Sequence, residues 1–167
     1  MRPALFLTDP QMTDTPDTVF AALHKAAEAA HGAKLFTVTV MDRAAGLVRR
    51  GYTSHPVEYP TTATKKLVGN GSEWSDLVIG RGQPFIANTT PEFARYFADH
   101  ETITAIGCAS AMNIPVLKDG QVVGTVNILD KENHFTPQVA ADFVALVEAH
   151  RPALLAAMAQ VPMGDAA

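Results

Sequence analysis

The chain has 167 residues, of which 47% are apolar and 18% charged, a composition typical of globular rather than disordered proteins. A chain of this length can bury most of the surface that its unfolded form exposes, so we expect one stand-alone domain. The formal net charge is -4, and no segment gathers lysine and arginine into the stripe that a phosphate backbone requires, which argues against nucleic-acid binding.

Cysteine content and apolar runs indicate the compartment. The single cysteine, Cys108, rules out an internal disulfide framework and a zinc site built from paired cysteines, and no two histidines have the spacing of a helical metal site. The N-terminal apolar run is too short for a signal peptide, and no apolar stretch reaches the ~18 residues of a membrane span. We therefore expect a cytoplasmic protein with no membrane segment and no bound metal.

The first elements are a helix and a hairpin that follow an N-terminal extension, residues 1–14. Thr15 is a suitable N-cap, and Gly32 lies where a C-terminal cap belongs, so the sequence predicts an amphipathic helix between them. Apolar alternation changes to period two over residues 35–41, which predicts a half-buried strand, and residues 47–53 are predicted to be its hairpin partner.

The middle of the chain is less regular. Prolines and glycines interrupt residues 54–71, and long loops of this kind are usually functional. Residues 73–79, which carry the single tryptophan, and residues 91–97 suit short helices, and residues 84–88 suit a short strand.

A second hairpin and a long helix follow. Residues 112–118 and 121–129 alternate as strands, and Asp119-Gly120 between them is a strong signal for a two-residue turn. Thr136 is the predicted N-cap of the last helix, and Pro152 is predicted to kink or restart it.

The second hairpin carries a family resemblance. Residues 113–128, Asn-Ile-Pro-Val-Leu-Lys-Asp-Gly-Gln-Val-Val-Gly-Thr-Val-Asn-Ile, resemble the GAF domain family, in which an apolar-Pro-apolar strand, a tight turn and an apolar-Gly-apolar strand follow one another. Phe135-Thr136-Pro137 and the helix after it are similar to the closing segment of that family. The resemblance covers residues 15–160 and leaves residues 161–167 as a flexible tail.

The resemblance implies a fold and a function. The fold class is α+β, with a central antiparallel sheet, the terminal helices on one face, and a lid of loops and short helices over a pocket on the other. The implied function is to bind an unidentified small molecule as a sensory or regulatory module without catalysis of its own.

Strand alternation indicates which sheet face holds the pocket. The face that we expect the helices to cover is uniformly apolar or small, and it contains Met112, Ile114, Val116, Val122, Gly124, Val126 and Ile128. The opposite face mixes small, apolar and hydrogen-bonding side chains, as ligand pockets do, and it contains Thr37, Thr39, Ala109, Ala111, Asn113, Val123, Thr125, Asn127 and Leu129.

The predicted ligand-binding residues come from this pocket face and the segments beside it, and they are Thr39, Tyr52, His55, Trp74, Cys108, Ser110, Asn113 and Asn127. Asn113 and Asn127 would be buried amides, whose partners are either a ligand or the backbone of the overlying loop. Trp74 and Tyr52, with Phe85, either form an aromatic wall over a planar ligand or close the core beneath a loop.

Two further residues have alternative interpretations. His55 opens the predicted lid, where it either contacts an anionic ligand or remains a solvated imidazole. Cys108 is the single thiol, but no basic residue adjoins it in sequence to lower its pKa, so the simpler interpretation is a small buried apolar residue.

One alternative function is enzymatic. The GAF-type free methionine sulfoxide reductases carry out thiol chemistry on this scaffold, with a glutamate, two aspartates and several cysteines. When the chain is aligned on Pro115, that glutamate falls at Ala111, the aspartates fall at Asn127 and Leu129, and Cys108 is out of register. The residues that polarise the substrate and exchange thiols are therefore missing.

Another alternative is cyclic-nucleotide binding of the phosphodiesterase type. Asp130-Lys131 and Phe135 match part of that motif, but Val139 replaces the acid at the start of the helix. The match is too incomplete to favour that ligand.

The resemblance also predicts partners. GAF domains typically dimerise through their terminal helices, and apolar stripes containing Leu23, Leu146, Leu154 and Met158 suggest a homodimer here. The signal would then pass to a separate output protein, or the ligand would be buffered.

Overall fold

The computed structural model describes residues 15–61, 64–67 and 72–164. Its strands are β1 (Leu35–Asp42), β2 (Leu47–Thr53), β3 (Thr64–Lys66), β4 (Phe85–Ala87), β5 (Ser110–Lys118) and β6 (Gln121–Asp130). Its helices are α3 (Pro16–Ala30), α4 (Glu73–Ser75), the π-helix η1 (Asp76–Gly80), α5 (Thr90–Ala94), α6 (His100–Ile106), α7 (Pro137–Ala149) and α8 (Arg151–Ala159).

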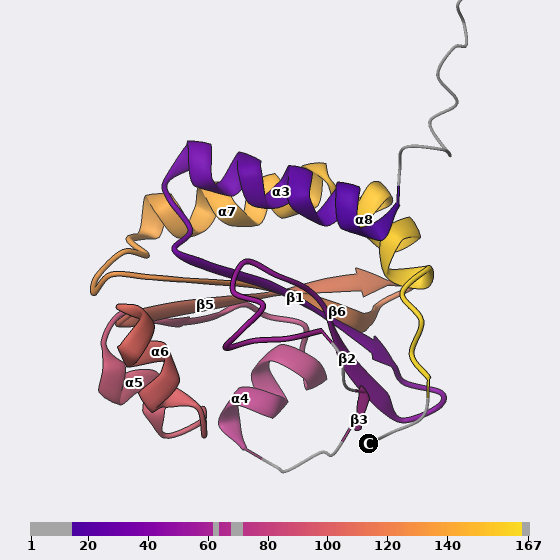
Figure 1. Ribbon diagram of the computed structural model, residues 1–167, viewed down its shortest axis with the longest axis horizontal. Coiled ribbons are helices and arrows are strands. Elements are labelled where there is room, and N and C mark those ends of the chain that lie inside the picture. Colours follow the sequence, from indigo (N-terminus) through magenta and orange to yellow (C-terminus); the bar gives the residue numbers. More distant parts are fainter. Residues whose placement is uncertain (1–14, 62–63, 68–71, 165–167) are drawn as a thin grey trace, which may run out of the picture.

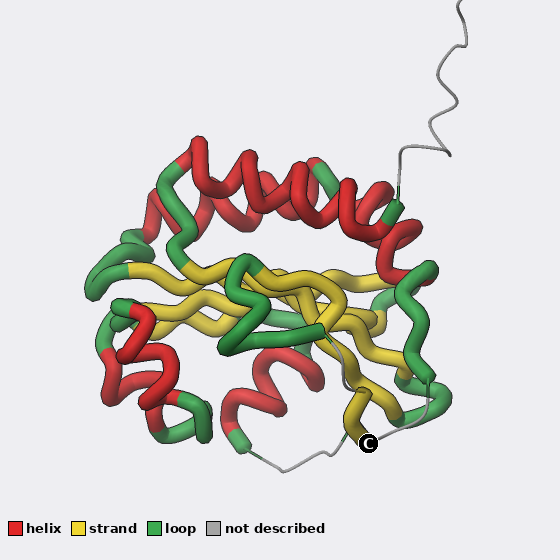
Figure 2. The backbone as a smooth tube through the Cα atoms, viewed as in Figure 1, coloured by secondary structure: helices red, strands yellow, loops and turns green. Residues whose placement is uncertain are grey.

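The strands form a six-stranded sheet in the order β3-β2-β1-β6-β5-β4, in which all neighbours are antiparallel. The terminal helices α3, α7 and α8 cover one face, and the short helices α4, α5 and α6 lie on the other (Figure 1). Loops join these short helices into a second layer below the sheet (Figure 2). The predicted α+β class and the placement of both layers are confirmed.

The terminal helices begin where capping predicts. The Thr15 hydroxyl accepts a hydrogen bond from the Thr18 amide at 3.3 Å and caps α3, and Thr136 accepts from the Val139 amide at 3.2 Å and caps α7. Pro152 lies in the first turn of α8, where its missing N–H costs nothing, and the helix is broken between α7 and α8 as predicted.

The β5–β6 hairpin closes through Asp119 and Gly120, which have φ of 52° and 81°. Positive φ at both positions is the geometry of the predicted two-residue turn. Strand β4 pairs only with residues 111–113 of β5, so Pro115 pairs with β6 on one side and with no β4 residue on the other. This arrangement suits a residue that has no N–H to donate.

The main core lies between the sheet and the terminal helices, on what we call the helix face. Its buried members include Phe20, Leu23, Phe36, Val38, Met112, Ile114, Val116, Val126, Ile128, Phe143, Leu154 and Met158. A Cβ atom on Gly124 would lie 2.5 Å from the Thr39 carbonyl oxygen and 2.8 Å from Met158 Cε, so α8 packs closely only because this residue has no side chain.

Two β-bulges change the expected alternation. The β1–β2 register shifts between Val38 and Thr39, so Gly51 is an extra residue and Tyr52 turns to the helix face instead of the pocket. The β5–β6 register shifts between Val116 and Leu117, so Val123 is extra. Val123 therefore packs against the helix-face core, and Val122 pairs with Leu117 outside that core, the reverse of the expectation for both residues.

Some segments differ from the sequence expectations. Strand β3 and helix α6 were not anticipated, and residues 161–164, expected to be part of a flexible tail, are anchored. Arg49 donates to the Pro162 carbonyl and Thr64 donates to the Met163 carbonyl. The predicted extension at residues 1–14 and the tail residues 165–167 lie outside the described residues.

The apolar side chains suggested for dimerisation are largely buried in the core of the protein itself. Leu23, Leu154 and Met158 are all at least 96% buried in the core, and Leu146 is partly buried against it, so these residues offer little surface to a partner. Among the described residues, no helix combines the length and apolar character needed to cross a membrane.

Candidate functional site

A cavity of about 660 Å³ lies between the second sheet face, which we call the pocket face, and the layer of short helices and loops. Its volume is within the usual range for small-molecule sites. The lining residues are Leu35, Thr37, Thr39, Met41, Arg43, Val48, Arg50, Tyr59, Lys66, Leu67, Trp74, Ser75, Ile79, Phe97, Asp99, Ile103, Asn113, Thr125, Asn127 and Leu129.

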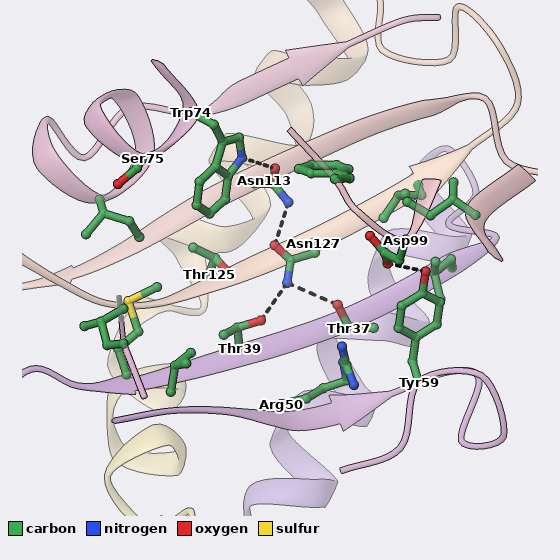
Figure 3. Close-up of a pocket in the computed structure, with 18 of the residues that line it drawn as sticks. Thr37, Thr39, Arg50, Tyr59, Trp74, Ser75, Asp99, Asn113, Thr125 and Asn127 are labelled. Atoms are coloured by element: carbon green, nitrogen blue, oxygen red, sulfur yellow. Dashed lines mark hydrogen bonds between the residues drawn. The ribbon is translucent and has the colours of Figure 1, made fainter. Parts of the chain in front are cut away.

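A chain of hydrogen bonds crosses the floor of the cavity and reaches its lid (Figure 3). Trp74 Nε1 donates to Asn113 Oδ1 at 2.9 Å, and Asn113 Nδ2 donates to Asn127 Oδ1 at 2.7 Å. Asn127 Nδ2 then donates to the hydroxyl oxygens of Thr37 and Thr39, both at 3.1 Å. The two buried amides thus pair with each other and with the lid tryptophan.

The direction of this chain follows from its first member. An indole N–H can only donate, so it fixes the Asn113 carbonyl oxygen toward Trp74 and the Asn113 amide nitrogen toward Asn127. Asn127 must then turn its own nitrogen toward Thr37 and Thr39. Both hydroxyl oxygens accept, so each hydroxyl hydrogen remains available for a further acceptor.

Thr125 adds a third hydroxyl to the pocket face. Its side chain lines the cavity and the residue is 3% exposed, yet within the described part of the chain its hydroxyl has no hydrogen-bond partner. Because this hydroxyl lines the cavity, it can bond there to water or to a bound molecule, so Thr125 is an open hydrogen-bonding position of the site.

One side of the cavity is cationic. The Arg50 guanidinium lies 4.9 Å from the centre of the Tyr59 ring and donates through Nη1 to the Pro60 carbonyl at 2.9 Å. Burial lowers the pKa of Arg50, but arginine remains charged at any physiological pH. Arg43 and Lys66 also line the cavity, and both residues are exposed.

Asp99 is the single carboxylate among the described residues that line the cavity. Tyr59 Oη donates to Asp99 Oδ2 at 2.5 Å. Burial and then this hydrogen bond raise the pKa of Tyr59, so the phenol stays protonated and keeps donating. The cavity therefore concentrates positive charge, although the chain as a whole is negative.

Four predicted site residues line the cavity together: Thr39, Trp74, Asn113 and Asn127. Tyr52 does not, because the bulge at Gly51 places it on the helix face, where its hydroxyl lies 2.9 Å from His24 Nδ1. His55 is also outside the lining, with its Nδ1 2.8 Å from the Ser54 hydroxyl.

Cys108 and Ser110 belong to the protein interior beside the cavity. Cys108 is 2% exposed within a small apolar cluster, and burial, followed by the charge of Asp130, raises the pKa of its thiol to about 11. Ser110 is fully buried and donates to the Lys131 carbonyl at 2.6 Å, a structural contact. Phe85 packs against the same apolar cluster as Cys108 and does not line the cavity.

The sequence did not single out Arg50, Tyr59, Asp99 and Thr125. Thr125 was on the predicted pocket face, and its polar side chain among apolar neighbours was the available signal. Arg50 reaches the pocket face ahead of the Gly51 bulge, and the other two lie in irregular segments whose placement no periodicity reveals.

Several solved structures share this fold. A domain of a sensor histidine kinase from Sinorhizobium meliloti 1021 is similar over 83% of this chain and 87% of its own, with 18% identity and a TM-score of 0.58. A GAF domain/HD domain protein from Geobacter sulfurreducens matches over 84% and 93%, with 11% identity and a TM-score of 0.66. At these identities the likeness concerns the fold alone.

The fold also includes an enzyme. The type II free methionine-R-sulfoxide reductase from Thermoplasma acidophilum matches over 89% of this chain and 96% of its own, with 12% identity and a TM-score of 0.62. No curated protein matches the chain. The sequence model of the GAF domain matches residues 14–149, and the chain therefore belongs to the GAF domain family.

Proposed function

We propose that this protein is a sensory or regulatory GAF domain that binds a small molecule in the cavity and does not transform it. The observation that carries the proposal is the cavity itself, about 660 Å³ in volume, with the lid held to the sheet by the bond from Trp74 to Asn113. A mostly apolar cavity with a few placed polar groups is the general form of a ligand site.

Contacts beyond the cavity support a regulatory role. Arg50 lines the cavity and binds the Pro60 carbonyl, while its neighbour Arg49 donates to the Thr61 carbonyl at 2.8 and 3.0 Å. Arg49 also binds the Pro162 carbonyl in the segment that follows α8. A ligand that moves Arg50 would therefore disturb the loop at residues 59–61 and, through it, the segment after the last helix.

The thiol-enzyme alternative has less support. A catalytic thiol must be accessible and readily ionised, whereas Cys108 is buried, has a raised pKa and lies outside the cavity lining. The chain also lacks carboxylates that the reductase family uses, since Ala111 and Asn127 occupy the aligned positions. Cyclic-nucleotide binding is supported only by the partial sequence motif at Asp130-Lys131 and Phe135.

Location and assembly belong to the same proposal. A cytoplasmic location is supported by the single cysteine, because a reducing compartment has no need of disulfides. A homodimer through the terminal helices would now use partly buried side chains such as Val19, Val144 and Leu155. Sedimentation velocity at micromolar concentration tests the dimer. A protein that sediments only as a monomer would contradict it, and the signal would then have to pass to a separate output protein.

Native mass spectrometry of freshly purified protein tests the proposed function. We expect a retained small molecule that leaves on denaturation. Thr39→Phe, which places a bulky ring on the cavity floor, should reduce the added mass, and Val57→Ala, at a residue 87% exposed, should leave it unchanged. Protein that carries no ligand, and whose Trp74 fluorescence does not respond to a metabolite extract, would contradict the proposal.

A further inference from the structure

Three pocket-facing side chains form a row across neighbouring strands. Arg50 of β2 pairs with Thr39 of β1, and Thr39 pairs with Thr125 of β6. Side chains directly opposite on adjacent strands have Cβ atoms about 4.5–5.5 Å apart, so one small chemical group can contact neighbours in the row. We call Arg50, Thr39 and Thr125 the donor row.

Each member of the donor row has hydrogen-bond capacity left. Thr39 accepts from Asn127 and keeps its hydrogen, and the Thr125 hydroxyl has no partner among the described residues. Arg50 uses one Nη1 hydrogen on Pro60, and no other bond from its guanidinium is recorded in the described chain. A cation and two hydroxyls that have hydrogens to give make a site for an acceptor, and an anionic acceptor fits best.

The surroundings favour a negative charge and an apolar body. Arg43 and Lys66, which line the cavity, have no ion pair within the described residues, and the Asp99 carboxylate is already engaged by Tyr59. The lining also includes apolar side chains such as Ile79 and Leu129, and Trp74, whose indole offers a flat face.

We infer that the cavity binds a small organic acid, with its carboxylate on the donor row and its apolar part against Trp74. This inference rests on the proposed function and names the class of its ligand. The carboxylate accepts from the Thr39 and Thr125 hydroxyls and is neutralised by Arg50. The Arg50 guanidinium can only donate, and the Asp99 carboxylate whose charge acts on it already accepts from Tyr59, so an anionic acceptor suits Arg50 better than a neutral ligand does.

Matched pairs of ligands test the charge requirement. The probes are straight-chain and phenyl-substituted carboxylic acids of two to ten carbons, each compared with its own primary amide, which is neutral and of nearly equal size. Binding is followed through the emission of Trp74, the single tryptophan of the chain and part of the cavity wall. We expect the acids that bind to exceed their amides by about tenfold or more, the usual scale for a bond to a charged group.

Substitution of Thr125 separates recognition from structure. Thr125→Val keeps the shape and removes the unpaired hydroxyl, so the free protein should be at least as stable as wild type while acid binding falls by about tenfold. Thr125→Ser keeps the hydroxyl and should retain the affinity of wild type to within about threefold. A structural hydroxyl would give the opposite pattern, with lower stability and unchanged binding.

The outcomes also distinguish this inference from the function on which it rests. Amides that bind as tightly as their acids, or acid binding that Thr125→Val leaves unchanged, would overturn the inference while keeping the cavity as a ligand site. Failure of every acid in the series to bind would overturn it as well. The proposed function falls only if the freshly purified protein also carries no small molecule.

Discussion

Asn127 is the centre of the hydrogen-bond chain on the pocket face, and its replacement by leucine tests that chain. The substitution removes three hydrogen bonds, those with Asn113, Thr37 and Thr39, without creating a large cavity. The two threonines line the cavity, where water can replace the lost partner. Asn113 also lines the cavity, but Trp74 keeps its amide nitrogen turned toward position 127, where the leucine side chain offers no acceptor.

The expected cost follows from that single orphaned group. Leaving a buried donor unsatisfied costs about 1–3 kcal/mol, so we expect Asn127→Leu to lower the free energy of unfolding by about 2 kcal/mol. For a domain of this size that corresponds to a fall of about 4–8 °C in Tm. Urea denaturation monitored by Trp74 fluorescence and by circular dichroism measures it.

An exposed amide provides the control. Gln138→Leu on the solvent side of α7 should change stability by no more than about 0.5 kcal/mol. If Asn127→Leu were as stable as wild type, the two amides would not hold the pocket face together. The inference that Trp74 fixes the donor and acceptor directions of the hydrogen bonds would then be refuted.

The remaining predictions concern Cys108 and Gly124. Because burial raises the pKa of the Cys108 thiol, its contribution to stability is fully present below the unfolded pKa of about 8.5 and is lost as pH rises toward about 11. Cys108→Ala should therefore flatten the fall in unfolding free energy across this pH range, as measured by urea denaturation. The protein should also show no methionine sulfoxide reduction with dithiothreitol, and turnover that Cys108→Ser abolishes would contradict the non-catalytic account. Gly124→Ala should lower unfolding free energy by about 1–3 kcal/mol because its Cβ meets the Thr39 carbonyl and Met158, whereas Gly80→Ala, 3.9 Å from its nearest neighbour, should have little effect by the same measurement.

The fold was largely predictable because its strongest signals are local. Caps at Thr15 and Thr136, the turn at Asp119-Gly120 and period-two alternation in the central strands each depend on residues close together in sequence. The same alternation placed Asn113 and Asn127 on one face, where the structure pairs them.

The parts of the site that were missed depend on features that alternation does not contain. A bulge at Gly51 reverses the side on which Tyr52 projects, so an aromatic residue expected in the pocket lies in the helix-face core, while Arg50 occupies the pocket face. A bulge adds one residue to one strand, and no local composition required it here. Tyr59 and Asp99 meet through a contact between segments 40 residues apart, which a single sequence without periodicity in those segments does not reveal.

The crystal structure of protein purified without added ligand tests the central claim most directly. We expect electron density for an organic molecule in the cavity, in contact with Trp74 and within hydrogen-bonding distance of the Thr125 hydroxyl. A cavity that contains only ordered water, or that has closed with Trp74 packed onto the sheet, would contradict it.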